Sequence, residues 1–368
     1  MGKINCFITI GSMQFGGIPK SLLSFLNFLE GKAEVDLLIW NNIIDLPIPE
    51  WVNVLDIPTV KSVKKVVKEE GILSKNLLVS LYGSVNKKRW QVMHSPKKEY
   101  DVAIAYDHVG LGKYYIIDKV EANKKFTFFH NGAYTFGDDI RSLDIEYYRK
   151  YDAVFAVSEH IKDMLHNELA KDIEIKVLHN LVDIKTINEQ GKESCEEMDS
   201  FDGLKFVTVG RLSEEKNQHI IPKVCAVLKR RKVNFRWYII GEGYFRENIE
   251  SEIQKNDVSD CCILCGSQIN PYKYMSRCDV YTQFSVYEAE PITIQEVAAF
   301  GKPMVLSNID GFKRYAKAFN NITLTDIDYE KIADKIIDSV GHEKEETEVI
   351  INLQKSDRKI IDDIILKG

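Results

Sequence analysis

Residues 206–217 read FVTVGRLSEEKN, a short apolar run followed by a glycine and two cationic residues. A continuously apolar run is typical of a strand that is buried on both faces of a parallel sheet. Open parallel sheets bind ligands at the carboxyl ends of their strands. We therefore expect Arg211 and Lys216 at a ligand-binding edge, after a tight turn that Gly210 allows. The pair suits a diphosphate, although a solvated loop has the same composition.

Similar apolar runs alternate with helix-length amphipathic segments along most of the chain, which is typical of βαβ units. Two series of strands are expected, at residues 4–10, 34–40, 102–106, 126–130, 153–157 and 175–178, and at residues 206–209, 235–240, 261–264, 280–282, 304–306 and 322–324. The chain has 368 residues, more than one hydrophobic core usually supports. We therefore predict an α/β protein with two Rossmann-like, doubly wound domains.

The expected domains are residues 1–184 and residues 185–342, joined through the polar, non-periodic segment 185–203. Residues 343–368 are expected to form a C-terminal helix that could fold back onto the first domain. No internal repeat interrupts this pattern. The sequence therefore predicts two sheets in one chain, each with its own carboxyl edge where a ligand could bind.

Composition argues against several classes of protein. Hydrophobic residues make up 45% of the chain and charged residues 28%, as in an ordinary globular enzyme. The formal net charge of -6 argues against nucleic acid as a partner. No apolar run approaches the roughly 20 residues of a transmembrane helix. Only Met1–Lys3 precede the first expected strand, too few for a secretory signal, so we expect a cytoplasmic protein.

The chain has seven cysteines without a regular framework, which suits reduced thiols. Cys261, Cys262 and Cys265 lie close together in the sequence, and Cys278 is the one candidate partner for a metal site there. Cysteine is also among the most buried residue types, so we favour packing in the core over a metal site.

A second motif, YEAEPITIQEVAAFGKP at residues 287–303, lies near the expected strand 280–282. Pro291 and Thr293 suit the start of a helix, and Gly301 suits its end. The exposed amides of Ile292 and Thr293 at that start could bind phosphate oxygens.

Two carboxylates flank this expected anion site. Glu288 lies in the loop that enters the helix, and Glu296 lies in its first turns. Acids beside an anion are reasonable where each accepts hydrogen bonds from hydroxyl groups, as sugars and ribose provide. They could also be acids that stabilise the helix start through its dipole.

The first expected domain offers two further candidates. Gly16 and Gly17 precede Pro19, which suits the first position of a helix, so the glycines lie at a helix start that could bind an anion. They could equally serve plain turn geometry. His130 ends an apolar strand and is expected to face the ligand edge, although a lone histidine is often a satisfied core or rim residue.

The two motifs of the second domain together resemble the retaining glycosyltransferases of the GT-B fold, in glycosyltransferase family 4, which includes bacterial capsule, lipopolysaccharide and mannosyl enzymes. The family's G-R-L-x-x-x-K-N pattern matches residues 210–217, and its E-x7-E pattern matches Glu288 and Glu296. Further matches in the first domain and its end are Gly16, Gly17, His130, Asn180 and Asp183. The resemblance covers most of residues 1–315 and is weak between residues 43 and 100.

The resemblance implies a GT-B enzyme whose two domains face each other across a cleft. It implies retaining transfer from a nucleotide-diphosphate sugar, with no cofactor or metal and with a UDP-sugar favoured over a GDP-sugar. Arg211 and Lys216 would hold the diphosphate, together with Gly210 and the amides at Ile292 and Thr293. The other implied roles are donor-sugar contact for Glu288, ribose binding for Glu296, base contact through the backbone of Ser267 and Gln268, and sugar or acceptor binding for His130.

One departure from the family and two weaker motifs complete the analysis. The family usually has glycine after its first glutamate, whereas here Ala289 is followed by a third acid, Glu290. An acid beside phosphates is costly unless it points at a sugar hydroxyl. Residues 241–246, GEGYFR, lack the third glycine of a dinucleotide fingerprint. Asp138 and Asp139 resemble the metal-binding acids of a different transferase fold, but nothing around them supports that role.

The acceptor expected from the family is a glycan or a lipid-linked glycan. Residues 61–98 carry ten basic side chains against two acids, Glu69 and Glu70. Their lysines recur at helical spacing, and Lys88 lies near Trp90, an expected interfacial aromatic. Such a segment could rest on anionic lipid at the inner membrane face, or it could be a helix with a solvated lysine face.

Two other functions fit parts of the sequence. A sugar-nucleotide epimerase or hydrolase could use the same fold and the same donor. A two-domain sugar-binding protein without catalysis is the second alternative, but such proteins are normally exported, and a binder of neutral sugars has no use for the cations Arg211 and Lys216. We therefore favour a glycosyltransferase that builds a surface polysaccharide.

Overall fold

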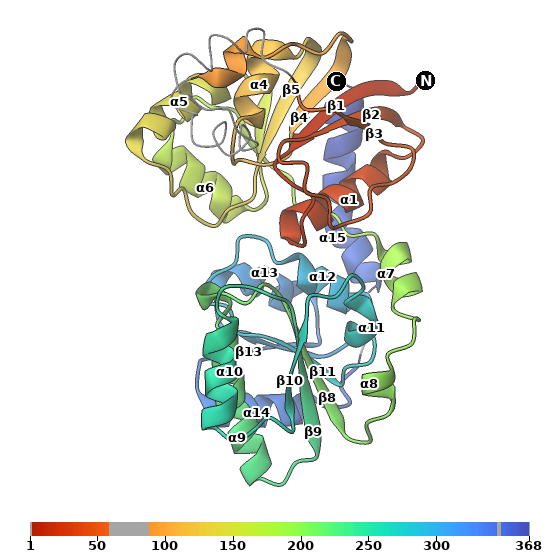
Figure 1. Cartoon of the computed structure of the whole chain (residues 1–368), viewed down its shortest axis with the longest axis vertical. Coiled ribbons are helices and arrows are strands. Elements are labelled where there is room, and N and C mark those ends of the chain that lie inside the picture. The colour runs from red at the N-terminus through yellow and green to blue at the C-terminus, as the bar shows by residue number, and fades with distance from the viewer. Residues whose placement is uncertain (1, 59–87, 344–346, 368) are drawn as a thin grey trace, which may run out of the picture. The chain divides into compact units, whose positions relative to one another are not determined.

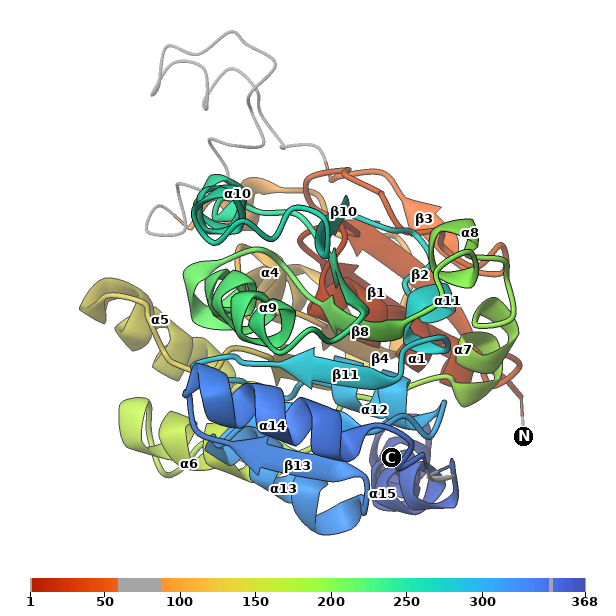
Figure 2. The same ribbon diagram turned by 90° about the horizontal axis from the view of Figure 1, so that it is seen from below.

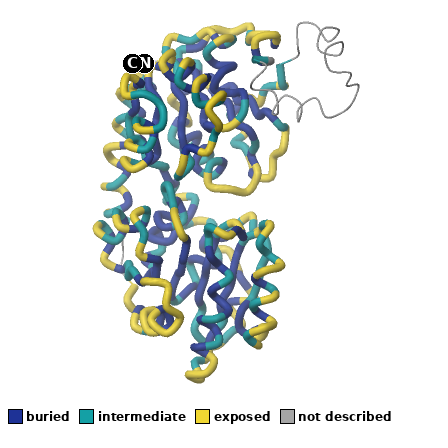
Figure 3. Tube along the Cα trace, turned by 90° about the vertical axis from the view of Figure 1, so that its left-hand side faces the viewer, coloured by how far each residue is buried: buried dark blue, intermediate teal, exposed yellow. Residues whose placement is uncertain are grey.

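The computed structural model describes residues 2–58, 88–343 and 347–367. The chain divides into two compact units, a first unit of Met1–Leu181 with Ser356–Gly368 and a second unit of Val182–Lys355. Each unit has a parallel sheet at its centre with helices around it (Figure 1). Figure 3 shows that the strands are the most deeply buried part of each unit, whereas the exposed residues gather in helices and loops.

Within the described residues, the first unit contains a seven-stranded sheet in the order β3-β2-β1-β4-β5-β6-β7. Its strands are β1 (Ile4–Ile10), β2 (Ala33–Ile39), β3 (Asn53–Leu55), β4 (Tyr100–Ala105), β5 (Ala122–Phe129), β6 (Ala153–Ala156) and β7 (Ile175–Val177). All neighbouring strands are parallel. The strand order changes direction between β1 and β4, which makes this edge a topological switch point.

The second unit repeats this plan with a six-stranded parallel sheet, counted in the described part of the chain, in the order β10-β9-β8-β11-β12-β13. Its strands are β8 (Leu204–Val209), β9 (Phe235–Ile240), β10 (Cys262–Gly266), β11 (Val280–Gln283), β12 (Met304–Ser307) and β13 (Ile322–Thr325). The switch point lies between β8 and β11. The predicted fold class of two doubly wound α/β domains is confirmed.

Helices cover both sheets. In the first unit they are α1 (Gly17–Leu29), α4 (Gly112–Lys119), α5 (Asp138–Tyr148) and α6 (Glu159–Glu168). In the second unit they are α7 (Ile184–Gln190), α8 (Glu196–Asp199), α9 (Ile221–Arg230), α10 (Arg246–Lys255), α11 (Tyr272–Met275), α12 (Ile292–Ala298), α13 (Asp310–Ala318) and α14 (Tyr329–Ser339). The last helix, α15 (Thr347–Ile360), continues as a π-helix over Ile361–Leu366. No helix within the described ranges is long and apolar enough to cross a membrane.

The second sheet has a separate core on each face, because alternate side chains of a strand point to opposite sides. Val207 and Val209 belong to the core beneath α11, α12 and α13, whereas Phe206 belongs to the core beneath α9, α10 and α14. Figure 2 shows α9 and α10 together, apart from α7 and α11. Burial on both faces explains why these strands read as continuous apolar runs.

The cysteines take part in the same packing. Cys261 and Cys262 are buried in the core beneath α9 and α10, and Cys278 is buried in the opposite core, as predicted. Cys265 is partly buried against the core that contains Cys278. Burial raises the pKa of Cys265 to about 12, and so its thiol stays protonated at neutral pH.

The segment 185–203, predicted as a non-periodic join, instead contains α7 and α8, and that prediction is wrong in its local structure. The Asp183 side chain begins α7 by accepting a hydrogen bond from the Thr186 amide at 3.2 Å. Each helix buries few apolar side chains, among them Ile187 and Met198. Helices this short show no periodic pattern, and so they could not be predicted from the sequence.

The C-terminal segment packs within the first unit. Ile361 and Ile365 lie in the core that α1 forms on the first sheet. Asp357 is buried, and its Oδ1 atom lies 3.0 Å from the backbone nitrogen and 3.0 Å from Nδ1 of His179. These contacts attach the end of α15 to the loop after β7.

A buried ion pair supports the helices of the first unit. Lys113 on α4 and Asp144 on α5 lie 2.7 Å apart, and their side chains are 2% and 0% exposed. The hydroxyl groups of Tyr114 and Tyr134 donate to the same carboxylate, at 2.5 and 2.8 Å. The lysine charge thus lies among aromatic rings, and Asp144 is the carboxylate that contacts it directly.

We expect Asp144→Ala to destabilise the protein by about 3–5 kcal/mol, because it leaves the buried Lys113 charge without its partner. Urea unfolding of the two proteins measures the difference. Asp172→Ala is the matched control, since Asp172 pairs with Arg149 on the surface and its loss should change stability little. Equal effects of the two substitutions would contradict the prediction.

Candidate functional site

The loop after β8 is held in place by glycines of the neighbouring loop. A Cβ atom on Gly241, whose φ is +145°, would lie 1.9 Å from the Gly210 carbonyl oxygen, and one on Gly243 would lie 2.1 Å from that of Leu212. Only glycine allows these approaches, which place Arg211 against the end of β9. Residues 241–246 lack the third glycine of a dinucleotide fingerprint, but their glycines determine the position of the loop after β8.

The two cations of the loop differ in their surroundings. The Arg211 side chain is 68% exposed, and its Nη2 atom donates to Glu215 at 2.9 Å. Lys216 ends a short 3-10 helix, and its side chain is only 22% exposed. Its ammonium lies 2.6 Å from Oε1 of Glu288. The structure thus joins Lys216 and Glu288, which the sequence placed in separate motifs.

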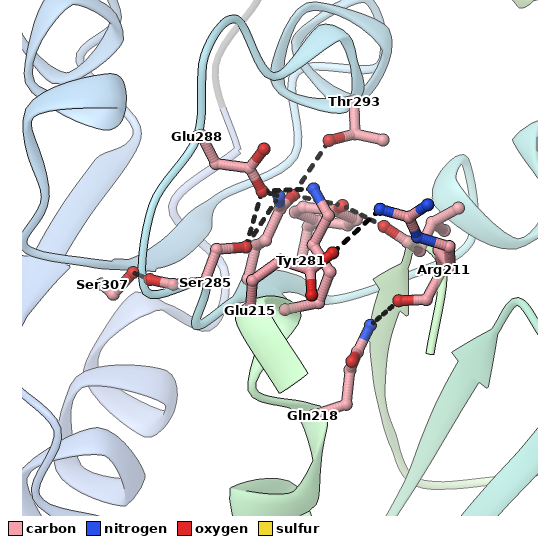
Figure 4. A network of polar contacts seen from close by, with 11 residues as sticks. Arg211, Glu215, Gln218, Tyr281, Ser285, Glu288, Thr293 and Ser307 are labelled. Atoms are coloured by element: carbon pink, nitrogen blue, oxygen red, sulfur yellow. Dashed lines mark hydrogen bonds and ion pairs between the residues drawn. The ribbon is translucent and has the colours of Figure 1, made fainter. Parts of the chain in front are cut away.

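Three donors converge on one oxygen of Glu288. Besides Lys216, the amide of Gln283 donates at 2.5 Å and the hydroxyl of Ser285 at 2.6 Å (Figure 4). Gln283 is oriented in turn, because its own Oε1 accepts from Tyr281 at 3.0 Å and from Thr293 at 2.9 Å. The side chain of Glu288 is 8% exposed, and this network compensates its burial.

Sequence reasoning missed Gln283 and Ser285. Gln283 ends the apolar strand β11 and Ser285 lies two residues beyond it, at the position where an open sheet binds ligands. A systematic search for polar residues there would have found them. Thr293, which was predicted for phosphate binding through its amide, also contributes its hydroxyl to this network.

Glu296 and Glu290 lie in other surroundings. Glu296 on α12 is 1% exposed and accepts from the Tyr272 hydroxyl at 2.8 Å. Burial, with the Glu296 carboxylate beside it, raises the pKa of Tyr272, so this phenol remains a donor. Glu290 accepts from the Tyr315 hydroxyl and from Arg314, the latter at 3.3 Å. Helix α13 supplies the partners of Glu290 in this structure, and a contact of Glu290 with a sugar hydroxyl stays a prediction.

The remaining donor-site candidates lie at the same edge of the second sheet. Gly266 ends β10, and its carbonyl accepts from the Gly241 amide at 2.8 Å, which places Ser267 and Gln268 beside the loop after β9. Gln268 donates to the Cys265 carbonyl at 2.8 Å. The ends of β8, β9, β10 and β11 thus form one surface. Pro291 precedes α12, and Ile292 and Thr293 are its first residues, as predicted.

In the first unit, His130 follows β5, and its ring lies nearly parallel to that of Phe128. Its Nε2 atom lies 2.8 Å from the Tyr106 carbonyl oxygen. Burial lowers the pKa of His130 from 6.5 to about 4, so the imidazole is neutral at pH 7 and donates through Nε2. Gly16 and Gly17 lie at the start of α1, as predicted.

The first unit also contains a buried acid, Asp107, that the sequence analysis missed. Asp107 is 7% exposed, and its Oδ2 accepts from the Gly11 amide at 2.7 Å. Among the described residues nothing donates to its Oδ1. The next residue, His108, accepts from the His130 amide through Nδ1 at 3.4 Å. These groups gather where β1, β4 and β5 end.

Other predicted features have structural roles. Asn180 accepts from Ser21 at 2.6 Å, and Asp183 caps α7. Asp138, 94% exposed, lies with Asp139 in the first turn of α5. Across the described residues no group of three or more histidine, cysteine, aspartate or glutamate side chains could hold a metal ion.

Most of the basic segment 61–98 lies outside the described residues. Where the segment is described, the expected interfacial aromatic is wrong, because Trp90 is 0% exposed and donates to Asp118 at 2.7 Å. Its ring stacks on that of Tyr114. Lys88 lies 3.6 Å from Glu146, so its charge has a partner on α5.

Comparison with protein families finds a match that covers most of the second unit. Residues 200–356 match the family model of glycosyl transferases group 1. This group 1 region contains the loop after β8, the Glu288 network and α12.

Curated relatives match over part of the chain. An N-acetylgalactosaminyltransferase of Campylobacter jejuni, named for a diphospho-undecaprenol-linked substrate, is 28% identical over 142 residues, which is 38% of this chain and 37% of that protein. The putative glycosyltransferase EpsF of Bacillus subtilis is 27% identical over 138 residues, 36% of each chain. The chain spans less than half the length of the curated relatives that it matches.

Solved structures match over nearly the whole chain. Anabaena HepE in complex with UDP and glucose superposes with a TM-score of 0.69 at 14% identity, over 99% of this chain and 97% of that one. Staphylococcus aureus TarM, in complex with UDP and glycan ligands, gives a TM-score of 0.62 at 14% identity, over 98% and 97%. At such identities the likeness concerns the fold, which is GT-B.

Because Asp107 is buried, its pKa is raised from 3.8 to about 7, although the Gly11 amide and the charge of Lys113 act to lower it. Between these two values the folded protein keeps a proton that the unfolded chain has lost, so stability falls as the pH rises. Asp107→Asn keeps an acceptor for Gly11 but removes this titration. We expect the stability of the variant relative to wild type to increase across that interval.

Urea unfolding at a series of pH values measures this difference. His130 produces the opposite slope between pH 4 and 6.5, but both proteins contain it, so its contribution cancels. A difference in stability that does not change with pH would contradict the raised pKa of Asp107.

Proposed function

We propose that the protein transfers a sugar, with retention of configuration, from a nucleotide-diphosphate sugar to a glycan or lipid-linked glycan in surface polysaccharide biosynthesis. The observation that carries this proposal is the Lys216–Glu288 ion pair at the carboxyl edge of the second sheet, inside the group 1 region. A cation beside a buried acid suits a donor that presents phosphate oxygens and sugar hydroxyls side by side.

The two cations can serve the diphosphate in different ways. A lysine ammonium has three N–H donors, so Lys216 can contact a phosphate oxygen while it holds Glu288. Arg211 is exposed and pairs with the partly buried acid Glu215, a contact at the surface that a diphosphate can replace. Its planar guanidinium can bind two phosphate oxygens at once. Glu288 is then the residue that contacts the donor sugar.

The chemistry we propose is electrostatic. As the bond between sugar and phosphate breaks, negative charge grows on the diphosphate, and Arg211, Lys216 and the amides of Ile292 and Thr293 stabilise it. The acceptor hydroxyl attacks from the face that the diphosphate leaves, its proton passes to the departing diphosphate oxygen, and we assign no covalent nucleophile. In the first unit, the neutral His130 binds sugar or acceptor hydroxyls, and Asp107 is a candidate acceptor of a hydroxyl hydrogen bond.

Related proteins guide the choice of substrates. The matched HepE and TarM structures contain UDP, which supports a UDP-sugar over a GDP-sugar as the donor. The Campylobacter jejuni relative is named for an undecaprenol-linked acceptor, which supports a lipid-linked glycan. Glu296 and the backbone of Ser267 and Gln268 are the proposed contacts of ribose and base. Attachment to the inner membrane face through residues 61–98 stays a prediction.

A thermal-shift screen with UDP, GDP and ADP, followed by product analysis, tests the function. A ligand that binds the folded state raises the melting temperature, so the matching nucleotide stands out. A glycan product that forms only with an acceptor supports a transferase. Free sugar or an altered sugar nucleotide without acceptor would indicate a hydrolase or an epimerase, and binding without any product would indicate a sugar-binding protein.

Arg211→Ala and Lys216→Ala should each lower kcat/KM by about tenfold to hundredfold, the value of a charged hydrogen bond of about 1.5–3 kcal/mol. Steady-state kinetics with the identified donor measures this loss. Arg230→Ala is the matched control, because the Arg230 side chain is 67% exposed and pairs with Glu330 away from the site. Wild-type kinetics in both site variants would refute the diphosphate assignment.

Turnover should survive treatment with EDTA, because side chains and helix amides meet the diphosphate charge in this proposal. The measurement is the initial rate before and after dialysis against the chelator. Complete loss that Mn²⁺ or Mg²⁺ restores would contradict this prediction and would direct attention back to Asp138 and Asp139.

A further inference from the structure

The acids Glu288 and Glu290 are two residues apart but have partners on different elements. Glu288 is held by residues at the ends of β8 and β11. Glu290, with a side chain that is 3% exposed, is held by Arg314 and Tyr315 of α13. The short segment 288–290 is therefore anchored on both sides, and the second anchor lies outside the candidate site.

A chain of buried hydrogen bonds continues from Glu290 through the second unit. Gln354 of α15 donates to Gln295 at 3.1 Å, Gln295 donates to the Tyr315 hydroxyl at 3.2 Å, and Tyr315 donates to Glu290. Gln295, Tyr315 and Gln354 are 3%, 1% and 1% exposed. The donors all point the same way, toward the carboxylate, so each bond polarises the next. Burial raises the pKa of Tyr315, which keeps its hydroxyl a donor.

Helix α13 also contacts Glu288 itself. A Cβ atom on Gly311 would lie 2.6 Å from the Glu288 carbonyl oxygen and 3.0 Å from its Cβ atom. The first turn of α13 therefore packs directly against the backbone of Glu288, while Tyr315, one turn further along, holds Glu290. A single rigid helix thus sets the backbone position of the segment at two points.

We propose that Tyr315 and Glu290 are positioning residues for turnover, which hold the Glu288 carboxylate where the donor sugar meets it. This inference rests on the proposed function, because it assigns a task to the same site. The hydrogen bond from Tyr315 to Glu290 acts on Glu288 through the backbone between residues 288 and 290. In this role neither Tyr315 nor Glu290 contacts the substrate. It matters because a small displacement of a group that acts in the transition state lowers the rate without preventing binding of the nucleotide.

The experiment compares four variants of the full chain. Tyr315→Phe removes the hydroxyl that Glu290 accepts from, and Glu290→Ala removes the carboxylate. Glu290→Gln keeps an oxygen that can accept from Tyr315 and should restore most of the rate. Tyr238→Phe is the matched control, because Tyr238 is equally buried and donates at 2.9 Å to the Glu197 carbonyl, away from segment 288–290.

The expected result is a fall in kcat of about tenfold to hundredfold for Tyr315→Phe and Glu290→Ala. The Kd of UDP, measured by calorimetry, should stay within about twofold, since Glu288 is assigned to the sugar and not to the nucleotide. Tyr238→Phe should lose thermal stability to a similar degree but keep wild-type kcat. If the kcat of Tyr315→Phe equals that of Tyr238→Phe, the inference is overturned, since the hydrogen bond from Tyr315 would then contribute to stability alone.

Gly311→Ala provides a second test if Tyr315→Phe folds poorly. Its added methyl group would press on the Glu288 carbonyl, and kcat should fall while the Kd of UDP stays unchanged. An unchanged kcat in Gly311→Ala overturns the inference. If the wild-type protein itself forms no glycan product with any donor, the proposed function fails, and the role of Tyr315 and Glu290 falls with it.

Discussion

The ion pair between Lys216 and Glu288 is the interaction on which the candidate site depends. A carboxylate that is only 8% exposed loses most of its hydration, at a cost of several kcal/mol unless a countercharge and hydrogen bonds replace the water. The partners come from the loop after β8, from the last residue of β11 and from the loop after β11, and these two strands are neighbours at the switch point of the sheet. The topology therefore brings the two motifs together, and the close approach of Gly241 to Gly210 sets the position of the first loop.

Most of the fold could be predicted because strands buried on both faces must be apolar throughout, and such runs stand out between amphipathic helices. Strand β3 was missed because it has three residues, two of them exposed, at the edge of the sheet. Helices α7 and α8 were missed for a related reason, since a helix of one or two turns shows no period. Each of these three elements is too short to show a hydrophobic period.

The charged residues of the candidate site could be predicted from the sequence, whereas the contacts between them could not. Arg211, Lys216 and Glu288 belong to motifs with fixed spacing, but nothing in the spacing indicates that Lys216 and Glu288 touch. That contact depends on the order of β8 and β11 in the sheet, which the sequence does not state. Trp90 was predicted in the wrong surroundings, because an aromatic residue next to cations can lie at a membrane surface or in a core. Its packing against Tyr114, which shows that it lies in a core, cannot be seen in the sequence.

The third acid, Glu290, shows how the chain accommodates an additional charge beside the candidate site. Ala289 and then Glu290 follow Glu288, so this turn lacks the backbone freedom of glycine and carries an added charge. A second negative charge near the candidate phosphate site is costly unless it is compensated, and on α13 Arg314 supplies a countercharge while Tyr315 donates a hydrogen bond. Helix α13 therefore contacts the segment at two points, because Gly311 also allows it to approach the backbone of Glu288.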